Sequence, residues 1–341
     1  MKAKIKLNIS AVILILLTVF FNGKIGRHVI LSEISYNADV MRAVNPKLEI
    51  KNYQYQLNKL DSQQTAADNE VYQQASAYAV VDFDSGDVIK SKNINIPLPI
   101  ASLTKIMTAV VALDLAQSDE IFTVSVKASK AVPTKIGIIP GQKLTLEELL
   151  DALLLTSAND VAEMIKEGID SKYGSPVFIK AMNNKAKFLG LLNTSFDNPQ
   201  GFDGPDNYSS SADMILLSRY ALTKYPLIAA IVKKDYQLLP KNKNHKQYDL
   251  YNWNGLLGVY PEVQGVKIGN TDKAGKTTVV LARRNGVKLL TVVLGAPSVL
   301  KRDLWAAKLL DIGFNNLKGL QMVGVGEDML KEKYNTWKYW N

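Results

Sequence analysis

The chain has 341 residues, of which 47% are hydrophobic and 21% are charged, a composition typical of a folded globular protein. It contains no cysteine and only two histidines, His28 and His245, which excludes thiol chemistry and leaves a Ser-His-Asp triad or a multi-histidine zinc site poorly supported. The net charge of +9 fits either attraction to an anionic polymer or lipid surface or an ordinary solvated surface, and no basic-aromatic pattern indicates a nucleic-acid partner.

The first predicted element is an apolar run from Ile9 to Phe21, preceded by lysines at positions 2, 4 and 6. Basic residues before about 13 apolar residues are typical of a secretory signal, and the run is short for a membrane span. We interpret residues 1–24 as an export signal or an uncleaved N-terminal membrane anchor. Residues 25–75, rich in glutamine and weakly periodic, are interpreted as a spacer. We therefore expect an extracytoplasmic protein that is secreted or membrane-anchored.

Two hairpins and several helices are predicted in the remainder of the chain. Ala77 to Phe83 has the pattern of a strand, and the turn Asp84-Ser85-Gly86-Asp87 joins it to a second strand at Val88. A stronger hairpin is predicted over 277–294, around Asn285-Gly286. Strands near both ends with helices between them predict an antiparallel sheet whose terminal strands meet. The predicted helices lie at 101–117, 145–156, 158–169, 175–189, 209–223 and 299–314.

Ser102 and Lys105 lie at the start of the first predicted helix, just after a pair of prolines. Their spacing places both side chains on one helical face. A hydroxyl at the dipole-positive end of a helix, with an amine one turn away, can become a nucleophile without histidine. The spacing is the S-x-x-K pattern of penicillin-recognising acyl-serine enzymes. The pattern is weak by itself, because Ser298 and Lys301 repeat it and a helix cap beside a solvated lysine would also produce it.

A second candidate segment contains Ser157 and Asn159, between two predicted helices and 55 residues after Ser102. Ser157 would relay protons there, and Asn159 would bind the substrate backbone. Both residue types also serve as ordinary helix caps, which is the structural alternative.

A third candidate segment, Lys267 to Thr271, precedes the late hairpin and is predicted to be a strand. The charge of Lys267 would attract a substrate carboxylate and help lower the pKa of Lys105. Gly269 would let a substrate backbone approach the strand edge. The amide of Asn270 would then complete an oxyanion hole with the amide of Ser102. An ordinary basic strand end is the structural alternative.

The three segments and their flanks resemble the low-molecular-mass penicillin-binding proteins, the D-alanyl-D-alanine carboxypeptidases of peptidase family S11. The resemblance runs from about Ser76 to Asn316. It implies an α/β fold of the α+β type, the serine β-lactamase/DD-peptidase-like fold, with a five-stranded antiparallel sheet flanked by helices and an all-helical subregion. Residues 76–316 would be the catalytic domain, and residues 317–341 a C-terminal tail that rests at a membrane interface or packs on the domain. The flanking segments that match are Gly141-Gln142-Lys143-Leu144-Thr145, Asn198-Pro199-Gln200-Gly201, Tyr208-Ser209-Ser210, Asp272-Lys273-Ala274-Gly275 and Gly313-Phe314-Asn315.

The resemblance also implies a reaction and roles for the residues. Ser102 would be the nucleophile and Lys105 its general base, with Ser157 and Asn159 as the second element and Lys267 as the third. The substrate would be the D-Ala-D-Ala terminus of a peptidoglycan stem peptide, cleaved through an acyl-serine intermediate. No metal or organic cofactor is implied, and β-lactams would act as covalent inhibitors.

The third motif departs from the family pattern, which is Lys-Thr-Gly, because Ile268 occupies the threonine position. The lost hydroxyl would cost about 1.5–3 kcal/mol of carboxylate binding, or about 10- to 150-fold in kcat/KM. Thr271 is a candidate partial substitute. A stem-peptide- or β-lactam-binding protein with weak turnover is therefore the alternative. A β-lactamase is a third hypothesis, although no Glu-x-x-Leu-Asn motif follows Asn159.

Overall fold

The structure is a computed structural model that describes residues 57 and 70–337. The predicted export segment, and the predicted spacer except for Leu57 and residues 70–75, lie outside the described residues. No helix in the described part of the chain is long and apolar enough to cross a bilayer.

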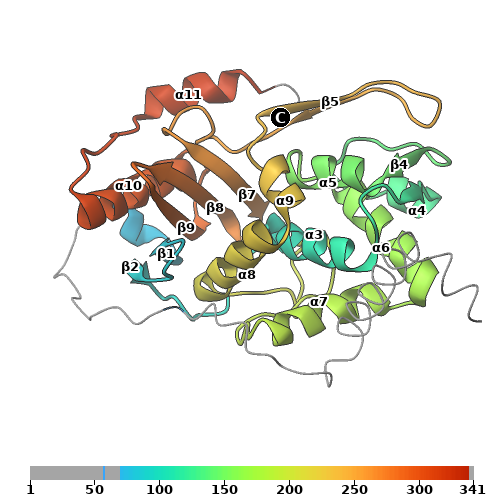
Figure 1. The fold of residues 1–341 in the computed structure, drawn as a ribbon, viewed down its shortest axis with the longest axis horizontal. Helices are drawn as coiled ribbons and strands as arrows, with labels where there is room; N and C mark the ends of the chain where they lie inside the picture. Colours follow the sequence, from blue (N-terminus) through green and yellow to red (C-terminus); the bar gives the residue numbers. More distant parts are fainter. Residues whose placement is uncertain (1–56, 58–69, 338–341) are drawn as a thin grey trace, which may run out of the picture.

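A five-stranded sheet in the order β2-β1-β9-β8-β7 forms the centre of the fold, and every neighbouring pair is antiparallel (Figure 1). Both predicted hairpins are confirmed, and β1 pairs with β9, so the strands near the two ends of the chain meet as expected. Strand β7 lies at one edge of the sheet. The strands are β1 (Ala77–Asp82), β2 (Val88–Lys92), β7 (Val263–Thr271), β8 (Gly275–Arg284) and β9 (Val287–Ala296).

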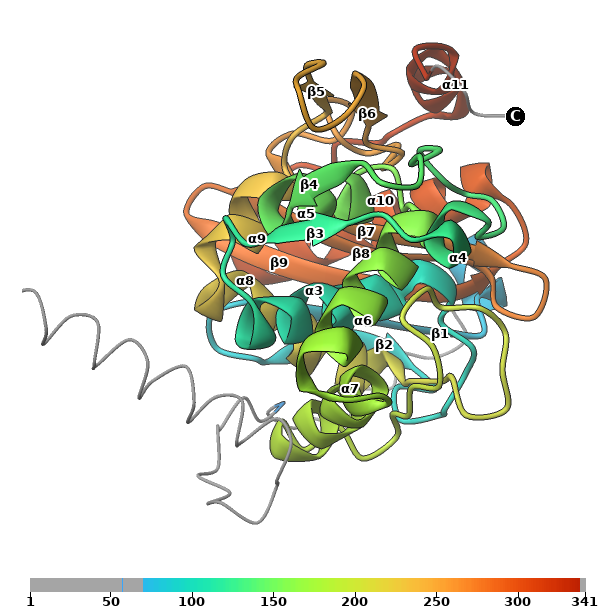
Figure 2. The ribbon, with the colours of Figure 1, turned by 90° about the vertical axis from the view of Figure 1, so that its right-hand side faces the viewer.

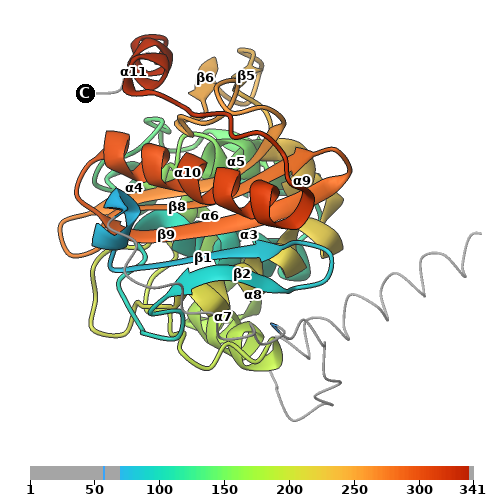
Figure 3. The ribbon, with the colours of Figure 1, turned by 90° about the vertical axis from the view of Figure 1, so that its left-hand side faces the viewer.

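Helices cover both faces of this sheet. One face is crossed by α10 (Val299–Lys318), which lies over β8 and β9 in Figure 3, next to the short helix η1 (Val71–Gln74). The other face is covered by α8 (Ser211–Lys224), and α3 (Thr104–Leu115) packs against α8 within the same apolar cluster. Beyond α3 lies the all-helical subregion, seen in Figure 2, which contains α5 (Leu146–Leu154), α6 (Asn159–Tyr173) and α7 (Val177–Phe188).

The alternation of side chains along β8 explains the two layers. Val279 and Leu281 belong to the apolar cluster on the α3 side, whereas Val280 and Ala282 belong to the cluster under α10. Successive residues of a strand point to opposite faces, so a strand buried on both sides is apolar throughout. The same alternation gives neighbouring residues of β7 different surroundings.

The six predicted helices are all present, with bounds that differ by a few residues. The main difference is at the start of the first helix, where residues Ala101–Leu103 form a separate 3₁₀ turn, η2, before α3 begins. Several further elements are not predicted by the sequence, because they are too short to show periodicity. These are β3 (Ile121–Thr123), α4 (Val126–Ser129), β4 (Lys143–Thr145), α9 (Pro226–Ile231), β5 (Tyr236–Leu239) and β6 (Tyr248–Tyr251).

The C-terminal tail packs on the domain as far as the structure describes it. Helix α10 continues to Lys318, past the boundary predicted at 316. A further helix, α11 (Glu327–Asn335), buries Leu330, and Trp337 is also buried. Of the two alternatives for the tail, a membrane interface or packing on the domain, the described residues up to 337 pack on the domain.

Candidate active site

Ser102 lies in η2, in front of the first turn of α3, where unpaired backbone amides and the helix dipole favour negative charge. Ala101 has a left-handed backbone with φ of 51°, which places a sharp turn directly before the serine. The hydroxyl of Thr277 donates to the carbonyl oxygen of Ile100 at 3.1 Å and ties η2 to β8. The sheet therefore holds Ser102 in position.

Two glycines allow two distant segments to close around Ser102. A Cβ atom at Gly201 would lie 2.0 Å from the carbonyl oxygen of Ala101, and one at Gly269 would lie 2.9 Å from the amide nitrogen of Ser102. Gly201 also has a φ of 89°. Both positions need a residue without a side chain, because the backbones approach too closely for a Cβ atom.

Lys105 is fully buried, and its Nζ atom touches three oxygen atoms. Nζ lies 3.0 Å from the Oγ atom of Ser102, 2.8 Å from Oδ1 of Asn159 and 2.6 Å from the carbonyl oxygen of Gln200. The carbonyl and amide oxygens can only accept hydrogen bonds. A neutral amine would therefore give its two hydrogens to Asn159 and Gln200 and present its lone pair to the hydroxyl of Ser102.

The surroundings of Lys105 favour this neutral form. Burial lowers the pKa of Lys105 well below its ordinary value, and the charge of Lys267 lowers it further, while Asp160 raises it. Because burial disfavours the charged ammonium and a nearby cation repels it, both effects favour an amine that can accept a proton.

The turn between α5 and α6 brings Asn159 into this cluster. Asn159 donates through its side chain to the carbonyl oxygen of Val132 at 3.2 Å and through its backbone to that of Thr134 at 2.7 Å. Ser157 lies in the same turn, with a left-handed φ of 59°. Among the described residues, Ser157 makes no hydrogen bond to Ser102 or Lys105.

Asp160 holds the loop that faces this turn. Its carboxylate accepts hydrogen bonds from the backbone amides of residues 136, 137 and 138, at 2.9 to 3.3 Å. A buried carboxylate that accepts several amides fixes the loop firmly, because each amide would otherwise lose its partner. The residue was not singled out from the sequence, where it is one more acidic residue at a helix start.

Lys267 lies on β7 and is only 2% exposed. Its Nζ atom donates to the carbonyl oxygen of Ile268 at 3.0 Å. Burial lowers the pKa of Lys267 to about 7, and the positive charge of Arg302 contributes. Arg302 lies in α10, fully buried, and pairs with Asp303 at 2.7 Å. Arg302 was also missed, since no local pattern links it to β7.

The last two residues predicted for substrate binding lie at the end of β7. Asn270 is exposed and accepts a hydrogen bond from Nζ of Lys276. The hydroxyl of Thr271 donates to Asp203 at 2.6 Å and accepts from the amide of Ala274 at 3.1 Å. The hydroxyl of Thr271 thus braces the β7–β8 turn, and its contribution to substrate binding stays a prediction.

A Cβ atom at Gly269 would face Ser102, so the alternation of side chains along β7 directs the neighbouring Ile268 to the opposite face of the sheet. Its partner across the ladder is Thr278, two residues before Val280, which lies in the cluster under α10. Ile268 belongs to one buried apolar cluster with Trp253 and Trp337, and the exposed fractions of Ile268, Trp253 and Trp337 are 6%, 8% and 8%. The isoleucine therefore does not fill the space in front of the serine.

A groove of about 820 Å³ lies at the end of β7, and among its lining residues Asn270 is the one predicted site residue. It is bounded by the turn before α6, by the end of β7 and by the β5–β6 hairpin. Its lining residues are Pro133, Thr134, Lys135, Ile136, Thr156, Lys246, Gln247, Tyr248, Asp249, Tyr251, Trp253, Asn270, Lys276 and Val299.

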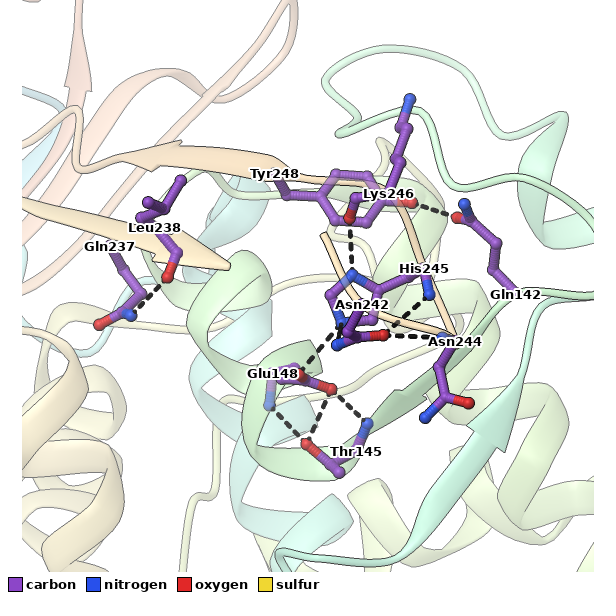
Figure 4. Close-up of polar contacts among 10 residues, drawn as sticks. All are labelled: Gln142, Thr145, Glu148, Gln237, Leu238, Asn242, Asn244, His245, Lys246 and Tyr248. Carbon is purple, nitrogen blue, oxygen red and sulfur yellow. Dashed lines mark hydrogen bonds and ion pairs between the residues drawn. The ribbon is translucent and has the colours of Figure 1, made fainter. Parts of the chain in front are cut away.

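The tip of the β5–β6 hairpin is fixed to the helical subregion through His245, as Figure 4 shows. Nε2 of His245 lies 3.2 Å from Oε1 of Glu148 in α5 and 2.8 Å from the side-chain nitrogen, Nδ2, of Asn242. Nδ1 of the same ring donates to the carbonyl oxygen of Lys246 at 2.6 Å. The hydroxyl of Tyr248 donates to Gln142 at 2.5 Å. The hairpin is therefore anchored at its tip, and the groove has a fixed outer wall.

Comparisons with known proteins agree with this arrangement. The profile of peptidase family S11, described as D-alanyl-D-alanine carboxypeptidase, matches residues 62–298. Carboxypeptidase DacF of Bacillus subtilis is 34% identical over 75% of this chain and 66% of its own length, just under two thirds. DacB2 of Mycobacterium tuberculosis is 32% identical over 70% of this chain and 82% of its own.

Solved structures agree as well. Carboxypeptidase DacD of Francisella tularensis has a TM-score of 0.67 and 26% identity, over 76% of this chain and 74% of its own. The Streptomyces K15 DD-transpeptidase has a TM-score of 0.66 and 29% identity, over 70% of this chain and 97% of its own. The predicted fold class is confirmed.

Proposed function

The chain belongs to peptidase family S11, the D-alanyl-D-alanine carboxypeptidases, and we propose that it is a serine-type carboxypeptidase that trims D-Ala-D-Ala stem peptides of peptidoglycan. The observation that carries this proposal is the contact of the buried Nζ atom of Lys105 with Ser102, Asn159 and Gln200. This arrangement offers an amine lone pair to the serine hydroxyl.

In the first step, Lys105 takes the hydroxyl proton as Oγ of Ser102 attacks the carbonyl carbon of the penultimate D-alanine. The negative charge that develops on the carbonyl oxygen is stabilised by the amides of Ser102 and Asn270, the first of which lies at a helix start. The C–N bond then breaks, the proton passes to the leaving amine through Ser157, and D-alanine departs.

In the second step, water attacks the acyl-serine carbonyl. Lys105 accepts a proton from the water and returns it to Oγ of Ser102 as the ester C–O bond breaks. The peptide leaves one residue shorter, and the amine is again neutral. Each step moves one proton through the same nitrogen, so a lysine with a lowered pKa suits both.

Lys267 supplies the positive charge for the terminal carboxylate of the substrate. Its lowered pKa in the free protein follows from burial, and a bound carboxylate would favour the charged form. The same charge lowers the pKa of Lys105. Binding of the carboxylate and activation of the base are therefore linked through one residue.

Peptidoglycan stem peptides are the proposed partners, and β-lactams the proposed covalent inhibitors. Because this polymer lies outside the cytoplasm, we propose an extracytoplasmic location, with residues 1–24 as the export signal or membrane anchor. Binding without efficient turnover, the alternative function, is not favoured, because the relatives that match the chain are named as carboxypeptidases.

The test uses the full chain with a fluorescent penicillin and, in parallel, a stem pentapeptide. Labelling and D-alanine release are both expected, and Ser102→Ala should abolish both. Ser298→Ala is the matched control, because Ser298 has the same spacing to a lysine and its Oγ atom instead accepts from the amide of Lys301 at 3.1 Å, as the cap of α10. Labelling without release would favour the binding protein, and no labelling would contradict the proposal.

A further inference from the structure

The C-terminal helix packs against the strand that carries the third motif. Trp337, two residues after α11, lies in one apolar cluster with Ile268 of β7 and Trp253. Tyr334 of α11 packs against the same cluster, with its ring centroid 4.8 Å from that of Trp337. The family profile ends at residue 298, so this contact comes from a segment outside the matched residues.

Three further contacts hold α11 in place. Leu330 is fully buried in the cluster under α10. Nζ of Lys333 pairs with Asp235 at 2.7 Å, and the hydroxyl of Tyr334 donates to Asp303 at 2.8 Å. Figures 1 to 3 show α11 beside the β5–β6 hairpin and above α10. A helix of nine residues would be marginal alone, so these contacts give it a defined position.

Apart from the burial of Leu330, the contacts of α11 involve residues that neighbour a part of the candidate active site. Asp235 precedes β5 at the base of the hairpin that walls the groove. Asp303 pairs with Arg302, whose charge lowers the pKa of Lys267. Tyr251, Trp253 and Val299 line the groove and belong to, or pack against, the cluster that contains Trp337.

We propose that residues 327–337 form a C-terminal clamp that positions β7 for catalysis, and that the apolar cluster shared by Trp337, Trp253 and Ile268 is its centre. Strand β7 lies at the sheet edge, so β8 supports it within the sheet on one side only. The clamp supports β7 from the face opposite Ser102. Trp337 is thus a positioning residue, and the isoleucine in the third motif completes the cluster. The proposal rests on the proposed function, because the reaction requires Gly269 and Asn270 at a fixed distance from Ser102.

The expected effect follows from how strongly rates depend on geometry. A misplacement of about 1 Å can cost about 100-fold in rate. Trp337→Ala should therefore lower the second-order rate of acylation by a fluorescent penicillin by about 10- to 100-fold. Met329→Ala is the matched control on the same helix, because Met329 is exposed and should change the rate less than twofold.

The decisive measurement is a double-mutant cycle with Ile268→Ala in the full chain. If Trp337 acts through Ile268, the double variant should react no more than about threefold more slowly than the slower single variant. Trp337→Phe, which keeps an aromatic ring, should recover the rate to within about threefold of the parent. A purely stabilising role would lower the melting temperature without this coupling.

The outcomes separate the clamp from the proposed function. No Ser102-dependent labelling of the parent chain would contradict the proposed function itself. Labelling of the parent with Trp337→Ala reacting equally fast, or with strictly multiplicative effects in the cycle, would overturn the clamp. If Trp337→Ala does not unfold cooperatively, the double-mutant cycle uses Trp337→Phe instead. The smaller loss of acylation rate in Trp337→Phe should then disappear in the Ile268→Ala background. Persistence of that loss would overturn the clamp.

Discussion

The two sides of the candidate active site are held together by different kinds of contact. On the helical side, Ser102, Lys105 and Asn159 are joined by hydrogen bonds between buried polar atoms. On the strand side, Ile268 pairs with Thr278 in the β7–β8 ladder and lies in an apolar cluster with two tryptophans. A short sequence motif identifies the Ser102–Lys105 contact well, because these two residues lie one helical turn apart, whereas Asn159 lies 54 positions after Lys105. The apolar cluster also depends on residues far away in the chain.

The two buried lysines, one on each side of the site, differ in their hydrogen-bond partners but share the main cause of their lowered pKa. Lys105 has three oxygen partners, and Lys267 donates to the carbonyl oxygen of Ile268. Burial is the main cause of the lowered pKa in both, and the second cause is a cation: Lys267 for Lys105, and Arg302 for Lys267. Because arginine stays charged at every accessible pH, the positive charge of Arg302 beside Lys267 does not change with pH. The strand side therefore contributes a positive charge that, after burial, is the second cause of the lowered pKa of Lys105.

The largest expected effect is that of Lys105→Ala, which tests the helical side of the site. Removing the base and its hydrogen bonds should slow penicillin acylation by about 10²- to 10⁴-fold. The measurement is the rate of fluorescent labelling under excess penicillin, with Lys301→Ala, from the second S-x-x-K match, as the control. A loss below tenfold would contradict the role of Lys105 as the base.

The next test compares two glycines with similar backbone strain. Gly201 and Gly141 have φ values of 89° and 84°, but a Cβ atom meets the backbone of Ala101 at Gly201 and nothing within 4 Å at Gly141. Both alanine variants should lose about 1 kcal/mol of unfolding free energy or more from strain. Only Gly201→Ala should also slow acylation by about 100-fold, because it displaces η2. Equal rates in the two variants would show that η2 tolerates movement.

The pH dependence tests the strand side through Lys267→Arg. As the pH rises through about 7, Lys267 in the free protein loses its proton and its attraction for the substrate carboxylate. The kcat/KM for a stem pentapeptide should therefore fall above about pH 7, on the alkaline side of a bell-shaped profile. Arginine stays protonated, so this fall should move upward by at least about two pH units in Lys267→Arg. If the alkaline limb is unchanged in Lys267→Arg, the fall in kcat/KM belongs to the titration of another group.

The smallest expected effect is that of Ile268→Thr, which restores the family residue. Since the side chain points into the cluster with Trp253 and Trp337, the hydroxyl would be buried among rings and should cost about 1–3 kcal/mol of unfolding free energy. The acylation rate should stay within about threefold of the parent. Stability is measured by denaturant unfolding and the rate by labelling, with Ile268→Val as the control. A rise of more than tenfold would show that the hydroxyl reaches the ligand.

The sequence by itself determined the local geometry of this protein. Alternating apolar residues around Asn285-Gly286 specified the late hairpin, and the spacing of Ser102 and Lys105 placed both on one helix face, because strand and helix periods repeat over a few residues. The order of the three motifs pointed to the family, which the comparisons show. The catalytic roles of the individual residues remain predictions.

Tertiary structure alone decided what surrounds those residues. The carbonyl of Gln200 contacts Lys105 across 95 positions of the chain, and Trp337, which follows the last predicted helix, joins the apolar cluster that contains Ile268. Burial and neighbouring charge set the pKa of each lysine, and both depend on which distant segments fold against it. Periodicity contains no information about such contacts, because it describes each element before the elements are packed together.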